Sequence, residues 1–142
     1  MAESSTSLKR HVALIIFYDE QGRILLQDRR NRSKWGEEWG FFGGGIEPGE
    51  TPEQAVIRET REELTHELKD FRFVETIHYP EVGESGGGSR SIFIAPLGDK
   101  LQHFDLKEGR GMQLFSFAEA RKLKMVVGDD KLLDRLEKEI KV

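Results

Sequence analysis

The sequence predicts one α/β domain in which a central mixed β-sheet lies between helices, an α/β/α sandwich. Three observations support this prediction. The chain has 142 residues, which is enough for a single core and too few for two ordinary domains. Short apolar segments rich in β-forming residues occur before and after a first segment with helical periodicity, and a second helical segment ends the chain. That order of elements favours a mixed sheet covered by helices.

The first elements are three short strands. Apolar runs at 11–18 and 23–27 are joined by the turn-forming residues 19–22, a pattern typical of a hairpin. A third short strand is expected at 39–42. We expect residues 1–9 to be disordered.

A helix is expected to begin at Pro52. Thr51 is a preferred N-cap residue, and proline suits the first helical position because its fixed φ matches the helix. Gln54 lies three residues after the cap, where its side chain can complete a capping box.

Three glutamates lie on one side of this helix. Glu59, Glu62 and Glu63 stand at i, i+3 and i+4, so they face one point. Like charges at this spacing cost roughly 0.2–0.5 kcal/mol per pair, which a divalent cation would offset. Mg²⁺ prefers oxygen ligands and is commonly held by a few carboxylates together with substrate phosphates. The alternative is a solvated acidic face that Arg58 and Arg61 partly neutralise.

Later segments add strands and two helices. Further strands are predicted at 71–79, 91–97 and 111–117. The first two form a pair, and the loop 81–90 between them is interpreted as a flexible hairpin. Ser116 and Glu119 have the spacing of a capping box, which opens a short helix. The last helix is predicted at 129–140, with one apolar stripe for burial: Leu132, Leu133, Leu136 and Ile140.

Composition and charge exclude several classes of site. The chain has no cysteine, which excludes disulfides, thiolate zinc sites and a cysteine nucleophile. The formal net charge is −4 with 22 basic residues, which argues against a surface that coats a nucleic acid polymer. No apolar run is long enough to span a bilayer, and residues 1–10 lack the apolar core of a signal peptide. We therefore expect a cytoplasmic protein with no membrane partner.

The segment GGGIEPGETPEQAVIRETREELTH, residues 43–66, resembles the Nudix box. The family pattern is G-x5-E-x7-R-E-U-x-E-E-x-G-U, where U is a bulky apolar residue. The box covers residues 44–66, and the residues at its fixed positions are Gly44, Glu50, Arg58, Glu59, Glu62 and Glu63. The resemblance implies that residues 1–142 form a single MutT-like Nudix hydrolase domain with the Nudix fold.

Three residues of this region depart from the family pattern. Thr65 and His66 stand where the pattern has glycine and an apolar residue, and Phe42 replaces the proline that commonly precedes the two glycines. A left-handed residue is favoured but not required at a helix C-terminus, so we expect a longer or looser helix end. The change at Phe42 bears on the fit of a nucleoside rather than on a metal site.

The resemblance implies a site for one to three Mg²⁺ or Mn²⁺ ions. By family analogy the ligands are the carbonyl of Gly43 and the carboxylates of Glu59, Glu62 and Glu63. Gly44 and Gly49 belong to the turn of the motif, and Glu50 supports this loop. The implied reaction is metal-assisted, in-line hydrolysis of a phosphoanhydride.

Two residues are candidates to accept the proton of the attacking water. One is Glu59, oriented by Arg58. The other is Glu108, because Lys107-Glu108-Gly109 is similar to a loop that assists catalysis in MutT-like members. The alternative for Glu108 is an exposed loop residue without a catalytic role.

Substrate contacts are expected from arginines and aromatic residues after the second strand. Arg29, Arg30 and Arg32 follow it, and similar Nudix proteins use an arginine here to contact phosphate through bidentate hydrogen bonds. The alternative is a solvated turn. Trp35 is a candidate to stack on a base, whereas Trp39, beside two phenylalanines, is better explained as a core residue.

Asp129 and Asp130 resemble the place where the MutT-like branch reads the nucleobase. An N-cap role explains Asp129 equally well. The leading substrate is therefore an unmodified or oxidised (deoxy)nucleoside triphosphate. Alternatives are a nucleotide sugar, a dinucleotide polyphosphate, a Nudix module that senses a nucleotide without cleaving it, or an interaction domain with an acidic helix. A small nucleotide is the expected partner, and the sequence leaves a homodimer open.

Overall fold

The computed structural model describes residues 10–31, 33, 36–79, 87–106, 111–126 and 129–140. The N-terminal segment 1–9, for which we predict disorder, lies outside them. The strands are β1 (Arg10–Tyr18), β2 (Ile24–Asp28), β3 (Trp39–Gly40), β4 (Phe42–Gly45), β5 (Arg72–Tyr79), β6 (Gly88–Pro96) and β7 (Gly111–Phe115). The helices are α1 (Pro52–Leu64), the 3₁₀ turn η2 (Lys100–His103), α2 (Phe117–Ala120) and α3 (Asp129–Glu139).

The described strands form a mixed sheet. Its order is β3-β2-β1-β6-β5, with β4 paired to β1 and β7 paired to β2. The long central strands β1 and β6 run parallel, whereas every other pair is antiparallel. Strand β1 pairs with β2, β4 and β6 and is therefore the central strand of the sheet.

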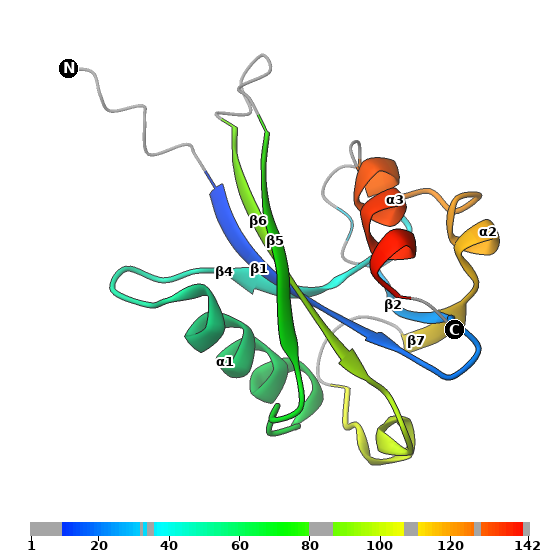
Figure 1. The fold of residues 1–142 in the computed structure, drawn as a ribbon, viewed down its shortest axis with the longest axis horizontal. Coiled ribbons are helices and arrows are strands. Elements are labelled where there is room, and N and C mark those ends of the chain that lie inside the picture. Colours follow the sequence, from blue (N-terminus) through cyan, green and yellow to red (C-terminus); the bar gives the residue numbers. More distant parts are fainter. Residues whose placement is uncertain are drawn as a thin grey trace.

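Helices cover both faces of this sheet. In Figure 1, α1 lies on one side of the central strands, and α2 and α3 lie on the other. Ile15 and Phe17 of β1 are buried in the core layer that contains Val56 of α1, whereas Ile16 is buried with Leu132 of α3. Alternate residues of one strand therefore serve opposite layers, as the pleat requires. The predicted α/β/α sandwich is confirmed, and the apolar stripe of the last helix is core packing.

Most predicted strands occur within one or two residues of their expected bounds. The turn 19–22 does join β1 to β2, with the backbone N–H of Gly22 bonded to the carbonyl of Asp19 at 3.1 Å. The expected strand 39–42 is two strands, β3 and β4, which pair with β2 and β1 respectively. In the loop 81–90, residues 88–90 already belong to β6, and residues 81–86 lie outside the described part of the chain.

The start of α2 follows from local chemistry. Ser116 accepts a hydrogen bond from the backbone of Glu119, and the Glu119 side chain accepts one in return from the backbone of Ser116. The predicted capping box therefore opens α2, and β7 ends just before it at Phe115.

The helices also differ from the sequence prediction in one respect, because the turn η2 was not expected. None of the described helices combines the length and the hydropathy needed to cross a membrane.

Candidate functional site

The helix α1 begins as the sequence predicts. The hydroxyl of Thr51 accepts a hydrogen bond from the backbone N–H of Gln54 at 3.1 Å, and the Gln54 side chain accepts one from the Thr51 N–H at 2.9 Å. This reciprocal capping box, with Pro52 in the first turn, fixes the start of the helix. The start in turn fixes which residues of α1 face the sheet.

Strand β4 brings the glycine turn against α1. Gly43 has a φ of +138°, and a Cβ there would lie 2.1 Å from the carbonyl oxygen of Ala13, so a side chain cannot be accommodated. Its backbone N–H donates to Oε1 of Glu63 at 3.1 Å. The first glycine of the turn is therefore tied both to the central strand and to the acidic face of the helix.

Gly44 lies directly against Glu59. A Cβ on Gly44 would come within 2.5 Å of the Glu59 carboxylate, whereas a Cβ on Gly45 would meet nothing within 4 Å. The missing side chain of Gly44 thus leaves the space that this carboxylate occupies. Gly49, later in the same loop, has a φ of +82°, which glycine adopts without strain.

Arg58 is the centre of a hydrogen-bond network. Its guanidinium donates to Glu50 at 2.7 and 3.0 Å and to the carbonyl of Gly45 at 2.9 Å. The same group donates to Glu59 at 3.0 Å and to Glu62 at 3.3 Å. The hydrogen bonds from Arg58 lower the pKa of Glu50 to about 2, aided by the backbone N–H of Glu47. Arg58 is thereby held as a cation between the loop and the helix.

The three predicted metal carboxylates differ in their surroundings. Glu63 is only 6% exposed, whereas the side chain of Glu62 is 56% exposed. Glu59 and Glu62 share the guanidinium of Arg58, and Glu63 accepts from the backbone of Gly43. Among the described residues, no three His, Cys, Asp or Glu side chains form a ready-made metal site. Glu59 and Glu62 converge on the guanidinium of Arg58, whereas Glu63 accepts from the backbone of the turn, and the shared metal site of the three carboxylates stays a prediction.

These residues nevertheless fit a hard divalent cation. Every candidate ligand atom is a carboxylate or carbonyl oxygen, the type that Mg²⁺ and Mn²⁺ prefer. The empty Cβ position of Gly44 leaves Glu59 beside the backbone of the turn. The carboxylates carry like charge at close spacing, and Arg58 is the cation that now offsets Glu59 and Glu62.

The end of α1 differs from the expected longer or looser helix. The helix ends at Leu64, and Thr65 itself adopts the left-handed conformation with a φ of 54°, donating its N–H to the carbonyl of Arg61 at 3.0 Å. A β-branched residue pays roughly 1–2 kcal/mol for this conformation. Thr60 is a fourth departure from the family pattern, which has an apolar residue there; it is buried and donates its hydroxyl to the Val56 carbonyl at 2.7 Å. Threonine thus replaces both an apolar residue and a glycine.

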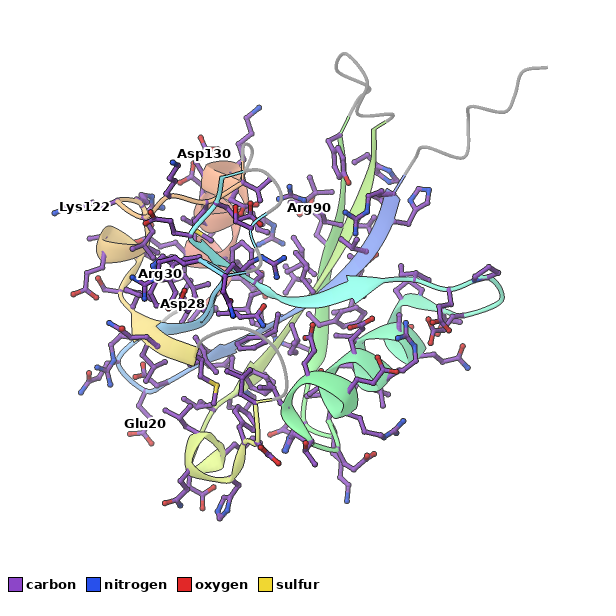
Figure 2. The ribbon with its side chains drawn as sticks, turned by 180° about the vertical axis from the view of Figure 1, so that it is seen from behind. Glu20, Asp28, Arg30, Arg90, Lys122 and Asp130 are labelled. Carbon is purple, nitrogen blue, oxygen red and sulfur yellow. The ribbon has the colours of Figure 1, made fainter. Side chains whose placement is uncertain are left out.

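Arg29 and Arg30 are already engaged in ion pairs. Arg29 donates to Glu37, which is 3% exposed, at 3.1 Å. Arg30 donates to both oxygens of Asp28, at 2.5 Å for the closest contact, and its guanidinium lies 5.7 Å from the ring centroid of Trp39. Figure 2 shows Asp28 and Arg30 together beside β2. These partners were not predicted: Asp28 ends β2 two residues before Arg30, and Glu37 lies between β2 and β3, eight residues after Arg29.

Asp129 is the first residue of α3 and is not its N-cap. It is buried and pairs with Arg90 of β6, whose guanidinium also lies 5.4 Å from the ring centroid of Tyr79. Burial raises the pKa of Asp129, and the charge and hydrogen bond of Arg90 oppose this rise. Figure 2 shows Arg90 between β6 and the helix that carries Asp130. No sequence pattern indicated Arg90, which lies in the segment interpreted as a loop.

Several predicted residues lie outside the described part of the chain. These are Glu108 with its neighbours Lys107 and Gly109, and also Trp35 and Arg32. Trp39 is partly buried, with its ring 4.9 Å from that of Phe115, as the core interpretation expects.

Comparison with known proteins decides the family. Residues 8–136 match the family model of the NUDIX domain. The chain belongs to the NUDIX family. This NUDIX chain is 33% identical over 69 residues to an 8-oxo-dGTP diphosphatase of Proteus vulgaris, covering 49% of the chain and 62% of that protein. It is 42% identical over 71 residues to a CTP pyrophosphohydrolase of Escherichia coli (strain K12), covering 50% of each protein.

The fold of the NUDIX chain is likewise that of MutT structures. The crystal structure of a MutT protein from Methanosarcina mazei Go1 superposes with a TM-score of 0.73 at 18% identity, covering 94% of this chain and 96% of that one. The sequence matches to the two curated relatives span only about half of this chain and 50–62% of theirs. The family therefore rests on the match of residues 8–136 to the NUDIX model, and the fold on the superposition with MutT structures.

Proposed function

We propose that this NUDIX chain is a divalent-metal-dependent hydrolase that cleaves a phosphoanhydride bond in a nucleoside diphosphate linked to a further group. The observation that carries this proposal is the arrangement around Arg58. One guanidinium joins the glycine turn to Glu50, Glu59 and Glu62, so the turn and the carboxylates of the family motif are in place together. The carboxylates Glu59, Glu62 and Glu63 are all retained, whereas we would expect a domain that senses a nucleotide without cleaving it to have lost some of them.

Glu59, Glu62 and Glu63 would hold Mg²⁺ or Mn²⁺, together with the carbonyl of Gly43. When bound, such an ion would neutralise pyrophosphate charge and lower the pKa of a bound water. Glu59 would accept the proton of the attacking water, with Glu108 as the other candidate. Arg58 would orient Glu59, to which it donates at 3.0 Å, and Glu50 would fix Arg58 from the opposite side through two hydrogen bonds.

The leading substrate is an unmodified or oxidised (deoxy)nucleoside triphosphate. The names of the two curated relatives, an 8-oxo-dGTP diphosphatase and a CTP pyrophosphohydrolase, support a triphosphate over a nucleotide sugar. Asp129, buried beside Arg90, and the exposed Asp130 are the candidates for contact with the base. Arg29 and Arg30 would contact phosphate only by sharing or leaving their present carboxylate partners.

A substrate screen with purified protein tests this proposal. The substrates would be nucleoside triphosphates, oxidised triphosphates, nucleotide sugars and dinucleotide polyphosphates, each with Mg²⁺, with Mn²⁺ and with EDTA. We expect metal-dependent release of pyrophosphate with the highest kcat/KM on a triphosphate. If kcat/KM were more than about tenfold higher, or roughly 1.4 kcal/mol, for a nucleotide sugar or a dinucleotide, the proposed substrate would be wrong. The proposed metal-dependent hydrolysis would still stand. Saturable nucleotide binding without any turnover would instead indicate a sensor.

A further inference from the structure

The C-terminal end of α1 is joined to the segment that follows η2. The backbone N–H of Asp105 donates to the carbonyl of Leu64 at 3.0 Å, and the hydroxyl of Thr65 donates to the carbonyl of Asp105 at 3.3 Å. The rings of His66 and Phe104 lie beside these bonds with centroids 5.1 Å apart. We call these five residues the end clamp. It connects segments that are forty residues apart in the sequence.

The end clamp contains two ionisable residues, His66 and Asp105, and only the histidine is of a type that ordinarily titrates near neutral pH. Its ring packs edge-on against Phe17 of β1 at 6.2 Å and against Phe104 at 5.1 Å, and those two rings lie 5.0 Å from each other. The family pattern has an apolar residue here, and the imidazole fills the same place in an aromatic cluster. A neutral ring suits these surroundings, whereas a charged one would lose hydration among apolar atoms.

Two charged groups act on the His66 ring. Burial lowers the pKa of His66, and Lys100 of η2 lowers it further by repelling the protonated form. Glu67 acts in the opposite direction, but its carboxylate is engaged by Arg61 at 2.5 and 3.0 Å. The environment therefore favours the neutral imidazole.

We propose that the end clamp is a pH-sensitive latch, in which protonation of His66 separates it from Phe17 and Phe104 and loosens the last turn of α1. That turn carries Glu62 and Glu63, so the latch acts on the part of the helix that precedes the clamp. The proposal rests on the contacts of the clamp and does not depend on the chemistry of the box.

The direction of the pH effect follows from linkage. Below the ordinary histidine pKa of about 6.5, the unfolded or opened chain binds the proton more readily than the closed clamp does. The contribution of the clamp is complete above that pH and is lost as the pH falls through the lower pKa of the closed state. Each unit of difference between these two pKa values corresponds to an about tenfold change in the opening equilibrium.

Amide hydrogen exchange at residues 61–65, corrected for the intrinsic pH dependence, measures this opening directly. In the wild-type protein, we expect protection at the end of α1 to fall between pH 7.5 and pH 5. His66→Phe keeps an aromatic ring without a titratable group, so its protection should stay constant over the same range. His103→Phe, at an exposed histidine of η2, is the matched control and should behave as the wild type.

An NMR titration of the histidine rings completes the test. We expect His66 to titrate below the ordinary histidine pKa of about 6.5. A pKa of His66 at or above that ordinary value would overturn the proposal, as would parallel pH profiles of protection in the wild type and His66→Phe. If His66→Phe does not fold, His66→Leu restores the residue type of the family pattern and takes its place. Neither measurement requires turnover, so failure of the latch and failure of the proposed hydrolysis are distinguishable.

Discussion

Two charged regions of this molecule use arginine in different ways. In the box, residues 47–63 contain six glutamates against two arginines, and Arg58 alone contacts Glu50, Glu59 and Glu62. In the second region, which we call the arginine region, each of three arginines pairs with one buried carboxylate: Arg29 with Glu37, Arg30 with Asp28, and Arg90 with Asp129. The box has negative charge to spare, whereas the arginine region is balanced.

This difference teaches which region can take up an ion without losing its own structure. A cation that enters the box adds a partner for carboxylates that now share one guanidinium. An anion that reaches the arginine region must compete with buried carboxylates, whose separation from arginine leaves charge uncompensated. The box is therefore the better candidate for a metal, and the arginine region is better explained as a set of ion pairs that stabilise the fold.

The largest expected effect comes from removing a carboxylate of the box. Glu62→Gln should lower turnover by at least on the order of 10²-fold, because a metal ligand is lost. Thermal stability without metal should stay equal or rise, because one repulsive charge is gone. Glu53→Gln, at an exposed glutamate of the same helix, is the control. If Glu62→Gln stays active but unfolds at a much lower temperature, then this carboxylate stabilises the fold and does not bind a metal. The box would then resemble the arginine region.

In the arginine region we expect a smaller effect on turnover, and a loss of stability where the box substitution causes none. Asp129→Ala leaves the partly buried Arg90 without its carboxylate, and we expect a loss of about 1.5–3 kcal/mol in the free energy of unfolding. KM for the true substrate should rise and the ranking of bases should change, with a smaller effect on kcat. Chemical denaturation and steady-state kinetics measure both. Unchanged stability would show that the pair does not stabilise the fold.

The glycine turn offers a matched pair of substitutions. Gly44→Ala places a Cβ within 2.5 Å of the Glu59 carboxylate, whereas Gly45→Ala meets nothing within 4 Å. We expect Gly44→Ala to lower kcat about tenfold, or about 1.4 kcal/mol, because Glu59 must shift. Gly45→Ala should retain activity. Equal losses in the two variants would indicate that the turn acts through backbone freedom and not through the space beside Glu59.

The Arg58 network should also appear in the acid denaturation of the protein. The ordinary pKa of a glutamate side chain is 4.5, and the pKa of Glu50 in the folded chain is about 2. Its contribution to stability is therefore complete above pH 4.5 and is lost as the pH falls toward 2. Glu50→Gln should flatten the stability profile in this window, and the exposed Glu20→Gln should not. Identical profiles would show that the hydrogen bonds from Arg58 do not stabilise the fold.

The smallest expected effect is at Thr65. Thr65→Gly relieves a left-handed threonine with a φ of 54° but loses the hydroxyl bond to Asp105 and adds freedom to the unfolded chain. These terms are each about 1 kcal/mol, so the net change in the free energy of unfolding should lie within about 1 kcal/mol of zero. Thermal unfolding without metal measures it. A large destabilisation would mean that the hydroxyl bond dominates the end of α1.

The parts of the molecule that the sequence predicts are those set by local spacing. The cap at Thr51 and Gln54 and the stripe that includes Leu132 and Leu136 depend on contacts within a few residues, and the structure confirms them. The break at Phe41 between β3 and β4 was not predicted, because it arises from pairing with two different strands.

The candidate site divides in the same way. The residues of the box lie in one motif, and the structure brings Arg58 and Glu50 together across eight positions. The partners Arg90 and Asp129 are 39 residues apart, so only the packing of α3 on β6 reveals them. Neutralisation of the acidic face by Arg58 was the alternative to a metal in the sequence, and the structure shows Arg58 donating to both Glu59 and Glu62.

The most direct test of the account is the dependence of hydrolysis on divalent metal and pH. Turnover of a nucleoside triphosphate by the wild-type protein and by Glu62→Gln would be followed from pH 6 to pH 9 with Mg²⁺, with Mn²⁺ and with EDTA. We expect activity only with metal, rising toward alkaline pH because the attacking water must lose a proton, and falling on the order of 10²-fold in Glu62→Gln at every pH. Turnover that resists EDTA, or that survives in Glu62→Gln, would contradict a metal-dependent site on the acidic face of α1.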